Sequence, residues 1–170
     1  MIFKNLRHRW RLCRQLFLLA LRHDVLIERA VTVKYVDSVA IGRHCTLQSG
    51  VYLYGSRGGN LVVIGDFVAI GAGGMLLGEG GLTIGDFTHF GPRVVVTTQY
   101  GDPASDKLVP QTVLKYAPVA IGRGCWLGAG SVIMPGAVLG DCCTVAPNSV
   151  VFGTWGDNVT LAGNPARSRQ

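Results

Sequence analysis

The feature that most constrains the fold is an aliphatic side chain that recurs at every sixth position. From Ile121 onward the recurring positions are Ile121, Leu127, Ile133, Leu139, Val145 and Val151. Four residues after each of the first five stands a small side chain, at Cys125, Ser131, Ala137, Cys143 and Ser149. The same spacing appears upstream in three trios, Ile41-Leu47-Leu53, Ile64-Ile70-Leu76 and Ile84-Phe90-Val96. A six-residue period matches neither an α-helix nor a simple strand alternation.

This period predicts a short strand followed by a tight corner, and three such units would close one triangular coil. The aliphatic residues would point inward, the small residues would occupy crowded positions, and glycine would tolerate the turns. Stacked coils would lie about 4.8 Å apart and pair as parallel strands. The sequence therefore predicts an all-β domain built as a parallel β-helix.

The N-terminal segment has a different composition. Residues 1–23 contain six Lys or Arg side chains and no acid, so the net charge of +6 is concentrated there. At about 100° per residue, one helical face would collect Phe3, Leu6, Trp10, Cys13 and Phe17. We predict a basic amphipathic α-helix over 1–28 and a β-helix domain over 29–170. Residues 1–23 could bind a membrane surface or cover the open end of the body, and no nucleic-acid motif accompanies the charge.

The cysteines do not form a metal-ligating or disulfide pattern. The five cysteines stand at positions 13, 45, 125, 142 and 143, with no C-x-x-C pair. Cys142 and Cys143 would point to opposite sides of a strand, which disfavours a zinc site or a disulfide framework. Free thiols are typical of a reducing cytoplasm. We expect a cytoplasmic protein, located at the inner face of the membrane if the N-terminal helix docks there.

Two ordered motifs resemble the hexapeptide-repeat acyltransferases, in particular the branch that O-acetylates exopolysaccharides and lipopolysaccharides. The stretch V-A-I-G-R-G-C-W-L-G-A-G-S-V-I-M-P-G, Val119 to Gly136, is similar to that branch's signature V-x-I-G-x-x-V-W-I-G-A-x-x-x-I-L-P-G. The segment A-G-N-P-A-R, Ala162 to Arg167, is similar to its closing motif. The resemblance implies left-handed coiling, acetyl-CoA as acyl donor, and a homotrimer with sites between subunits. The acceptor it implies is a sugar or a lipid-linked sugar.

The repeat is interrupted between Val96 and Val119, where we expect an excursion loop over 97–118. A long departure from a regular solenoid is usually functional or disordered. In similar family members a histidine in this loop acts as general base and removes the proton of the acceptor hydroxyl. Here Gln99, Tyr100 and Gly101 stand where that histidine would lie, and no histidine follows Phe90. The expected base is therefore absent from the loop.

His89 is the candidate to replace that base. It should point outward from its strand, between Ala69 and Trp126 of the neighbouring coils, and a solvent-exposed imidazole is suited to proton transfer near neutral pH. A surface or subunit-contact role for His89 stays open, and His44 lies further from the loop. Loss of a general base typically costs about 10²–10⁴ in rate, so a chain without one could bind ligand without efficient catalysis.

The resemblance implies further site residues. Gln99, Tyr100, Asp102 and Trp126 would contact the acceptor, and the pantetheine arm of acetyl-CoA would pass the backbone amides near Ala129 and Ala146. Arg167 would meet the nucleotide phosphates or remain a solvated tail charge. We therefore expect an acetyl-CoA-dependent O-acetyltransferase that transfers directly, without a covalent enzyme intermediate. The alternative is a catalytically lapsed repeat protein that binds a ligand or partner as a scaffold or regulator.

Overall fold

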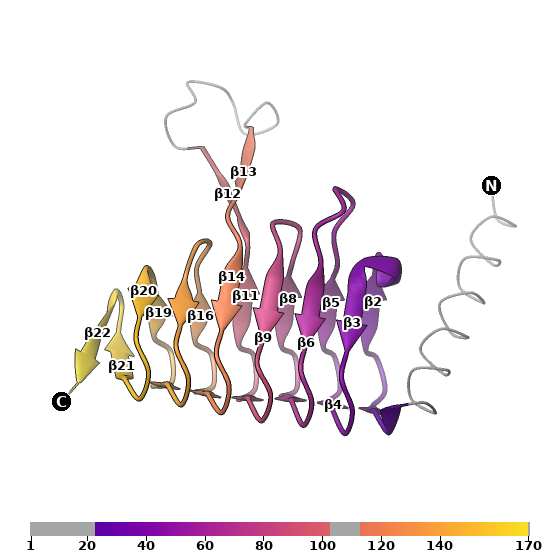
Figure 1. Cartoon of the computed structure of the whole chain (residues 1–170), viewed down its shortest axis with the longest axis horizontal. Helices are drawn as coiled ribbons and strands as arrows, with labels where there is room; N and C mark the ends of the chain where they lie inside the picture. Colours follow the sequence, from indigo (N-terminus) through magenta and orange to yellow (C-terminus); the bar gives the residue numbers. More distant parts are fainter. Residues whose placement is uncertain (1–22, 103–112, 170) are drawn as a thin grey trace, which may run out of the picture.

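The chain forms a parallel β-helix in a computed structural model that describes residues 23–102 and 113–169 (Figure 1). Triangular coils stack along the long axis, and each coil contributes one short strand to each of three sheets, which we call A, B and C. The predicted parallel β-helix is confirmed. The stacking is consistent with the left-handed coiling that the family resemblance implies.

The strands are short because each must end at a corner of the triangle. Sheet A holds β1 (Leu26–Ile27), β4 (Thr46–Leu47), β7 (Ala69–Ile70), β10 (His89–Phe90), β15 (Trp126–Leu127), β18 (Thr144–Val145), β21 (Thr160–Gly163) and β22 (Ala166–Arg169). Sheet B holds β2 (Thr32–Lys34), β5 (Tyr52–Tyr54), β8 (Met75–Leu77), β11 (Val95–Thr97), β16 (Val132–Ile133) and β19 (Val150–Val151). Sheet C holds β3 (Val39–Ile41), β6 (Val62–Ile64), β9 (Leu82–Ile84), β14 (Val119–Ile121), β17 (Val138–Leu139) and β20 (Thr154–Trp155). A short 3-10 helix, η1 (Val36–Ser38), connects β2 to β3, and β12 (Gln99–Gly101) and β13 (Leu114–Tyr116) form a separate hairpin.

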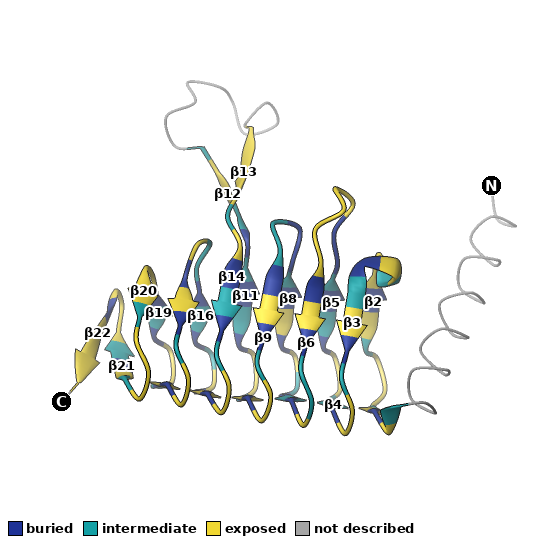
Figure 2. Ribbon diagram, in the orientation of Figure 1, coloured by how far each residue is buried: buried dark blue, intermediate teal, exposed yellow. Residues whose placement is uncertain are grey.

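The coil register places the recurring aliphatic residues in ladders that run the length of the core. Phe90, for example, is aligned with Ile70 in the preceding coil and with Leu127 in the next. Leu47, Leu53, Leu127 and Ile133 are completely buried (Figure 2). The small residues of the repeat are buried as well, which fits their predicted place where the chain has least room.

The solenoid begins earlier than the expected boundary after residue 28. β1 pairs in parallel with β4, and Val25 just before it is buried in the core. Residues 24–28 therefore belong to the first coil, because their side chains continue the inward and outward alternation of sheet A. The helix predicted for the N-terminus lies mostly in residues 1–22, outside the described residues. Within the described residues, no helix is both long and apolar enough to span a bilayer.

Aspartate side chains join successive coils at the corner between sheets C and A. Asp66 Oδ1 accepts a hydrogen bond from the backbone N–H of Arg43 (2.7 Å), and Asp86 Oδ1 accepts one from the backbone N–H of Asp66 (2.8 Å). The bond from Arg43 is the main reason that the pKa of the Asp66 carboxyl lies below its ordinary value. Asp141 and Asp157 repeat the arrangement near the C-terminal end.

The cysteines provide a chemical test of this packing. Cys142 is exposed at a corner, whereas Cys45, Cys125 and Cys143 are buried, and burial raises the pKa of Cys125 to about 11. In a Cys13→Ser variant, we expect Cys142 to react with iodoacetamide at mildly alkaline pH at least about tenfold faster than the buried thiols. Peptide mapping by mass spectrometry would measure the rates. Equal labelling of Cys125 and Cys142 would contradict the stated orientation of these residues.

Candidate active site

His89 and Trp126 lie side by side on the outer surface of sheet A, in β10 and β15. They occupy matching register positions, and their rings stack with centroids 5.8 Å apart and planes inclined by 15°. The Trp126 side chain is 57% exposed, and His89 is exposed too. The predicted outward direction of His89, and its neighbours Ala69 and Trp126, are confirmed.

Thr88 fixes this direction from the inside. Its side chain is completely buried, and its hydroxyl donates to the carbonyl of Gly122 (2.8 Å) and accepts from the backbone N–H of Cys125 (3.2 Å). Because side chains alternate along a strand, an anchored Thr88 turns His89 outward. A substrate that approaches from solvent can therefore reach the imidazole, as a general base requires.

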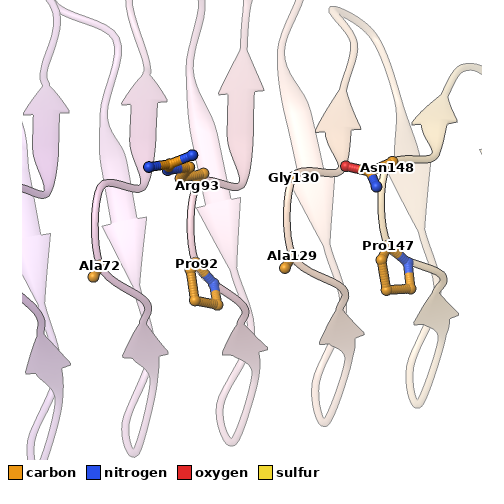
Figure 3. Close-up of a pocket in the computed structure, with 7 residues that line it drawn as sticks. All are labelled: Ala72, Pro92, Arg93, Ala129, Gly130, Pro147 and Asn148. Carbon is orange, nitrogen blue, oxygen red and sulfur yellow. The ribbon is translucent and has the colours of Figure 1, made fainter.

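A groove of about 560 Å³ follows the corner between sheets A and B, close to these two rings. Figure 3 shows its lining residues in two rows across successive coils; they are Ala72, Pro92, Arg93, Ala129, Gly130, Pro147 and Asn148. Pro92 stands three residues after His89, so the Cα atoms of these two residues are at most about 11 Å apart. The groove is therefore an extended surface next to a candidate base.

Tight glycine contacts beneath the groove hold successive corners together. A Cβ atom on Gly91 would lie 2.7 Å from the backbone nitrogen of Ala129, and one on Gly128 would lie 2.5 Å from the nitrogen of Pro147. Only glycine permits that approach without displacing backbone. These contacts set the spacing of the coils whose corners line the groove.

The two residues expected near the acyl donor lie differently relative to this groove. Ala129 lines it, whereas Ala146 does not, and the backbone N–H of Ala146 donates to the carbonyl of Leu161 (2.8 Å). That N–H therefore takes part in the ladder between successive coils. Pro147 and Asn148, the next residues, line the groove instead.

Arg93 is the charged side chain among the lining residues, and the sequence reasoning missed it. It follows Gly91-Pro92 at a corner, with a backbone φ of 58°. The repeat itself could have identified Arg93, because the groove residues occupy the second and third positions after each buried residue of sheet A. Arg167 lies elsewhere, in β22, where its Nη1 donates to the carbonyl of Ala166 (3.1 Å).

The excursion begins as an antiparallel hairpin at a different corner, between sheets B and C. In it Gln99 is aligned with Tyr116, and Tyr100 with Lys115. Asp102 forms an ion pair with Lys115 (2.8 Å), and the hydrogen bond from Lys115 to Asp102 raises the pKa of that lysine. The part of the predicted loop that the structure describes is therefore ordered by strand pairing, and residues 103–112 lie outside the described residues.

The predicted site residues thus form two groups. His89 and Trp126 lie on sheet A beside the groove, whereas Gln99, Tyr100 and Asp102 lie on the hairpin. Sheet B separates the two groups within one chain, because the groove follows its corner with sheet A and the hairpin leaves its corner with sheet C.

Comparison with known proteins finds repeat models and transferases. Residues 118–153 match a model described as bacterial transferase hexapeptide (six repeats), and residues 29–54 match the hexapeptide repeat of succinyl-transferase. WbbJ of Escherichia coli K12, which has the provisional name of a lipopolysaccharide biosynthesis O-acetyl transferase, is 33% identical over 94 residues, covering 51% of this chain and 48% of WbbJ. The galactoside O-acetyltransferase of Lactococcus lactis is 29% identical over 125 residues, covering 74% of this chain and 59% of that protein.

Among solved structures, AntD of Bacillus cereus is an N-acyltransferase, and a point mutant of it was crystallised with dTDP and coenzyme A. That mutant aligns with a TM-score of 0.76 and 25% identity, covering 86% of this chain and 80% of AntD. The chain spans about half the length of the first curated relatives it matches, 48% of WbbJ and 56% of WcaF from Escherichia coli.

Proposed function

The chain is a hexapeptide-repeat protein with the fold of the acyltransferases of that group, and from this premise we propose that it transfers an acetyl group from acetyl-CoA to a sugar hydroxyl. The acceptor is a bacterial surface sugar or its lipid-linked precursor. The groove carries the proposal, because it extends over successive coils at the corner that directly follows the strand of the exposed His89. The names of WbbJ and the galactoside enzyme support O-acetylation.

In this mechanism acetyl-CoA supplies an activated acetyl thioester, and the protein positions the acceptor and handles its proton. His89 accepts the proton of the acceptor hydroxyl as the oxygen attacks the thioester carbon. The new C–O bond forms, the C–S bond breaks, and the departing thiolate takes up the proton that His89 held. Trp126 stacks on the imidazole and limits its rotation, while Gln99, Tyr100 and Asp102 contact the acceptor.

The donor would lie along the groove, with Ala129, Pro147 and Asn148 on its walls. Arg93 can neutralise negative charge there, and Arg167 serves the nucleotide phosphates at the C-terminal end. Because the hairpin and His89 lie at different corners, the proposed assembly is a homotrimer in which a neighbouring subunit completes the site. We place the protein in the cytoplasm, where the basic residues 1–23 either bind the inner membrane surface or cover the open end of the β-helix.

A second function is favoured by the missing loop histidine. Gln99 stands in the stretch where that histidine would lie, and an amide cannot accept the acceptor's proton. If His89 serves only a contact between subunits, the chain binds acetyl-CoA or a partner as a lapsed transferase. Turnover of acetyl-CoA separates this function from the first.

A tryptophan in the groove tests donor binding. Ala129 is exposed on the groove wall, so Ala129→Trp should fill the channel and weaken acetyl-CoA binding by about tenfold or more, measured by isothermal titration calorimetry. Ala40→Trp, at an exposed position of β3 in sheet C, is the matched control and should bind normally. Equal affinity in both variants would place the donor elsewhere.

A further inference from the structure

The five tyrosines of the chain are not scattered. Tyr52 and Tyr54 lie in β5 of sheet B, Tyr35 follows β2, and Tyr100 and Tyr116 lie in the hairpin that leaves the same sheet. All therefore belong to the outer face of sheet B or to segments at its corner with sheet C. These tyrosines are not part of the donor groove, because the groove lies at the opposite corner of sheet B, where it meets sheet A.

Three of these rings form a contiguous cluster. Tyr35 meets Tyr54 edge to face with centroids 5.0 Å apart, and Tyr52 stacks near Tyr54 with centroids 6.3 Å apart. A hydrogen bond with the Tyr35 side chain raises the pKa of Tyr54. Tyr35 is 41% exposed and has a φ of 53°, a backbone conformation that bulky residues rarely adopt. Tyr35 is thus exposed and Tyr52 and Tyr54 are half-buried, so the cluster lies at the surface of sheet B.

A buried acid and an exposed guanidinium adjoin this cluster. The Glu79 side chain is only 9% exposed, and both of its carboxylate oxygens lie 3.3 Å from the backbone nitrogen of Arg57. The Arg57 guanidinium contacts Glu79 through Nε (3.7 Å) and covers the Tyr35 ring at 5.9 Å, yet that side chain remains 59% exposed. Glu79 therefore holds Arg57 in place beside the tyrosines while leaving much of its guanidinium accessible.

The loop that carries Arg57 leaves space at this point. No atom lies within 4 Å of a Cβ atom placed on Gly59, and at Gly58 only the Ser56 hydroxyl comes that close. This loop, between β5 and β6, projects on the same side of the β-helix as the hairpin of β12 and β13 (Figure 1). The loop that carries Arg57 and the hairpin therefore extend from the same corner region of the β-helix.

We propose that Tyr35, Tyr54 and Arg57, supported by Glu79, bind a sugar ring of an oligosaccharide acceptor. Pyranose rings have an apolar C–H face that packs on aromatic rings and a rim of hydroxyls that accept from guanidinium and tyrosine donors. The proposal rests on the proposed function and extends it, because the bound ring is separate from the ring that is acetylated. The preferred substrate is then an oligosaccharide rather than a single sugar.

Saturation-transfer NMR tests the site without requiring turnover. The probes are lactose, cellobiose, maltotriose and a digalacturonic acid, each added to the full-length protein in the absence of acetyl-CoA. We expect at least one probe to receive saturation at its ring C–H protons, and Tyr54→Ala and Arg57→Gln to weaken its affinity by about tenfold. Phe152→Ala removes another exposed aromatic side chain, remote from the cluster in sequence, and should leave binding unchanged.

The outcomes separate this site from the proposed function. Saccharide binding that depends on Tyr54 and Arg57, without any acetyl transfer, would uphold the site and defeat the transferase. Acetyl transfer with the same KM in wild type and Tyr54→Ala would uphold the transferase and overturn the site. Absence of saturation transfer to all four probes, or equal affinity in wild type and Tyr54→Ala, would also overturn it. Circular dichroism of each variant verifies that the β-helix is intact.

Discussion

His89→Ala should lower the kcat of acetyl transfer by about 10²–10⁴ while leaving acetyl-CoA affinity within about twofold of wild type. The reason is chemical, since His89 is the histidine exposed beside the groove and no residue after it in the chain is a histidine. A sugar hydroxyl attacks a thioester slowly unless a base takes its proton. Release of coenzyme A with a saturating acceptor measures kcat, and calorimetry measures the affinity.

His44→Ala is the matched control for this variant. His44 is also half-exposed and stacks on an aromatic ring, Phe67 (4.8 Å), but it stands two coils from His89 and contacts Asp24 (3.0 Å). It should retain full activity. Added imidazole should restore part of the rate in His89→Ala only. Unaltered turnover in His89→Ala would remove His89 from the mechanism.

Gly85→Ala, at the corner between sheets C and A, should be strongly destabilising. Its new Cβ atom would lie 2.6 Å from the backbone nitrogen of Arg123 and 2.7 Å from the carbonyl carbon of Gly122, and neither is a flexible side chain. The two coils would have to separate, at a cost of about 3 kcal/mol, which corresponds to a fall of about 6–12 °C in Tm. Differential scanning calorimetry measures the change.

Gly156→Ala makes the same chemical change at the equivalent corner position of a later coil. There no atom lies within 4 Å of the added Cβ atom, and the φ of Gly156, like that of Gly85, is not in the left-handed region. Its Tm should equal or slightly exceed that of wild type, because alanine loses less backbone entropy on folding. Equal Tm losses in the two variants would mean that the close approach of the next coil is not the reason that position 85 requires glycine.

The sequence was sufficient to predict most of the fold, because a solenoid repeats the same short unit of strand and corner. A buried residue such as Leu127 is aligned with Phe90 in one neighbouring coil and with Val145 in the other, and its counterparts in other coils have equivalent neighbours. A fixed spacing in sequence therefore becomes a fixed position within the coil. The alternation that put Thr88 inside and His89 outside follows from the same regularity. The repeat models that match the chain confirm the family resemblance drawn from Val119–Gly136.

The sequence was less informative where the chain departs from the repeat. The first coil starts at residues 24–28, which carry too little of the pattern to be distinguished from the preceding segment. The hairpin depends on pairing between residues far apart, as in Gln99 with Tyr116. The family resemblance does not state which backbone N–H groups the sheet ladder uses, and the N–H of Ala146 is one of them. Arg57 and Glu79 are brought together by a tertiary contact between two coils, which no spacing encodes.

The most direct measurement of the central claim follows the acetyl group itself. The protein is mixed with acetyl-CoA labelled in its acetyl carbon and with bacterial oligosaccharides, and the products are analysed by mass spectrometry before and after hydroxylamine treatment. Transfer to a sugar hydroxyl predicts a labelled, hydroxylamine-sensitive ester that forms about tenfold more slowly with Ala129→Trp at limiting acetyl-CoA and at the wild-type rate with Ala40→Trp. Acetyl-CoA that binds in the groove but leaves every sugar unlabelled would contradict it and favour the lapsed transferase.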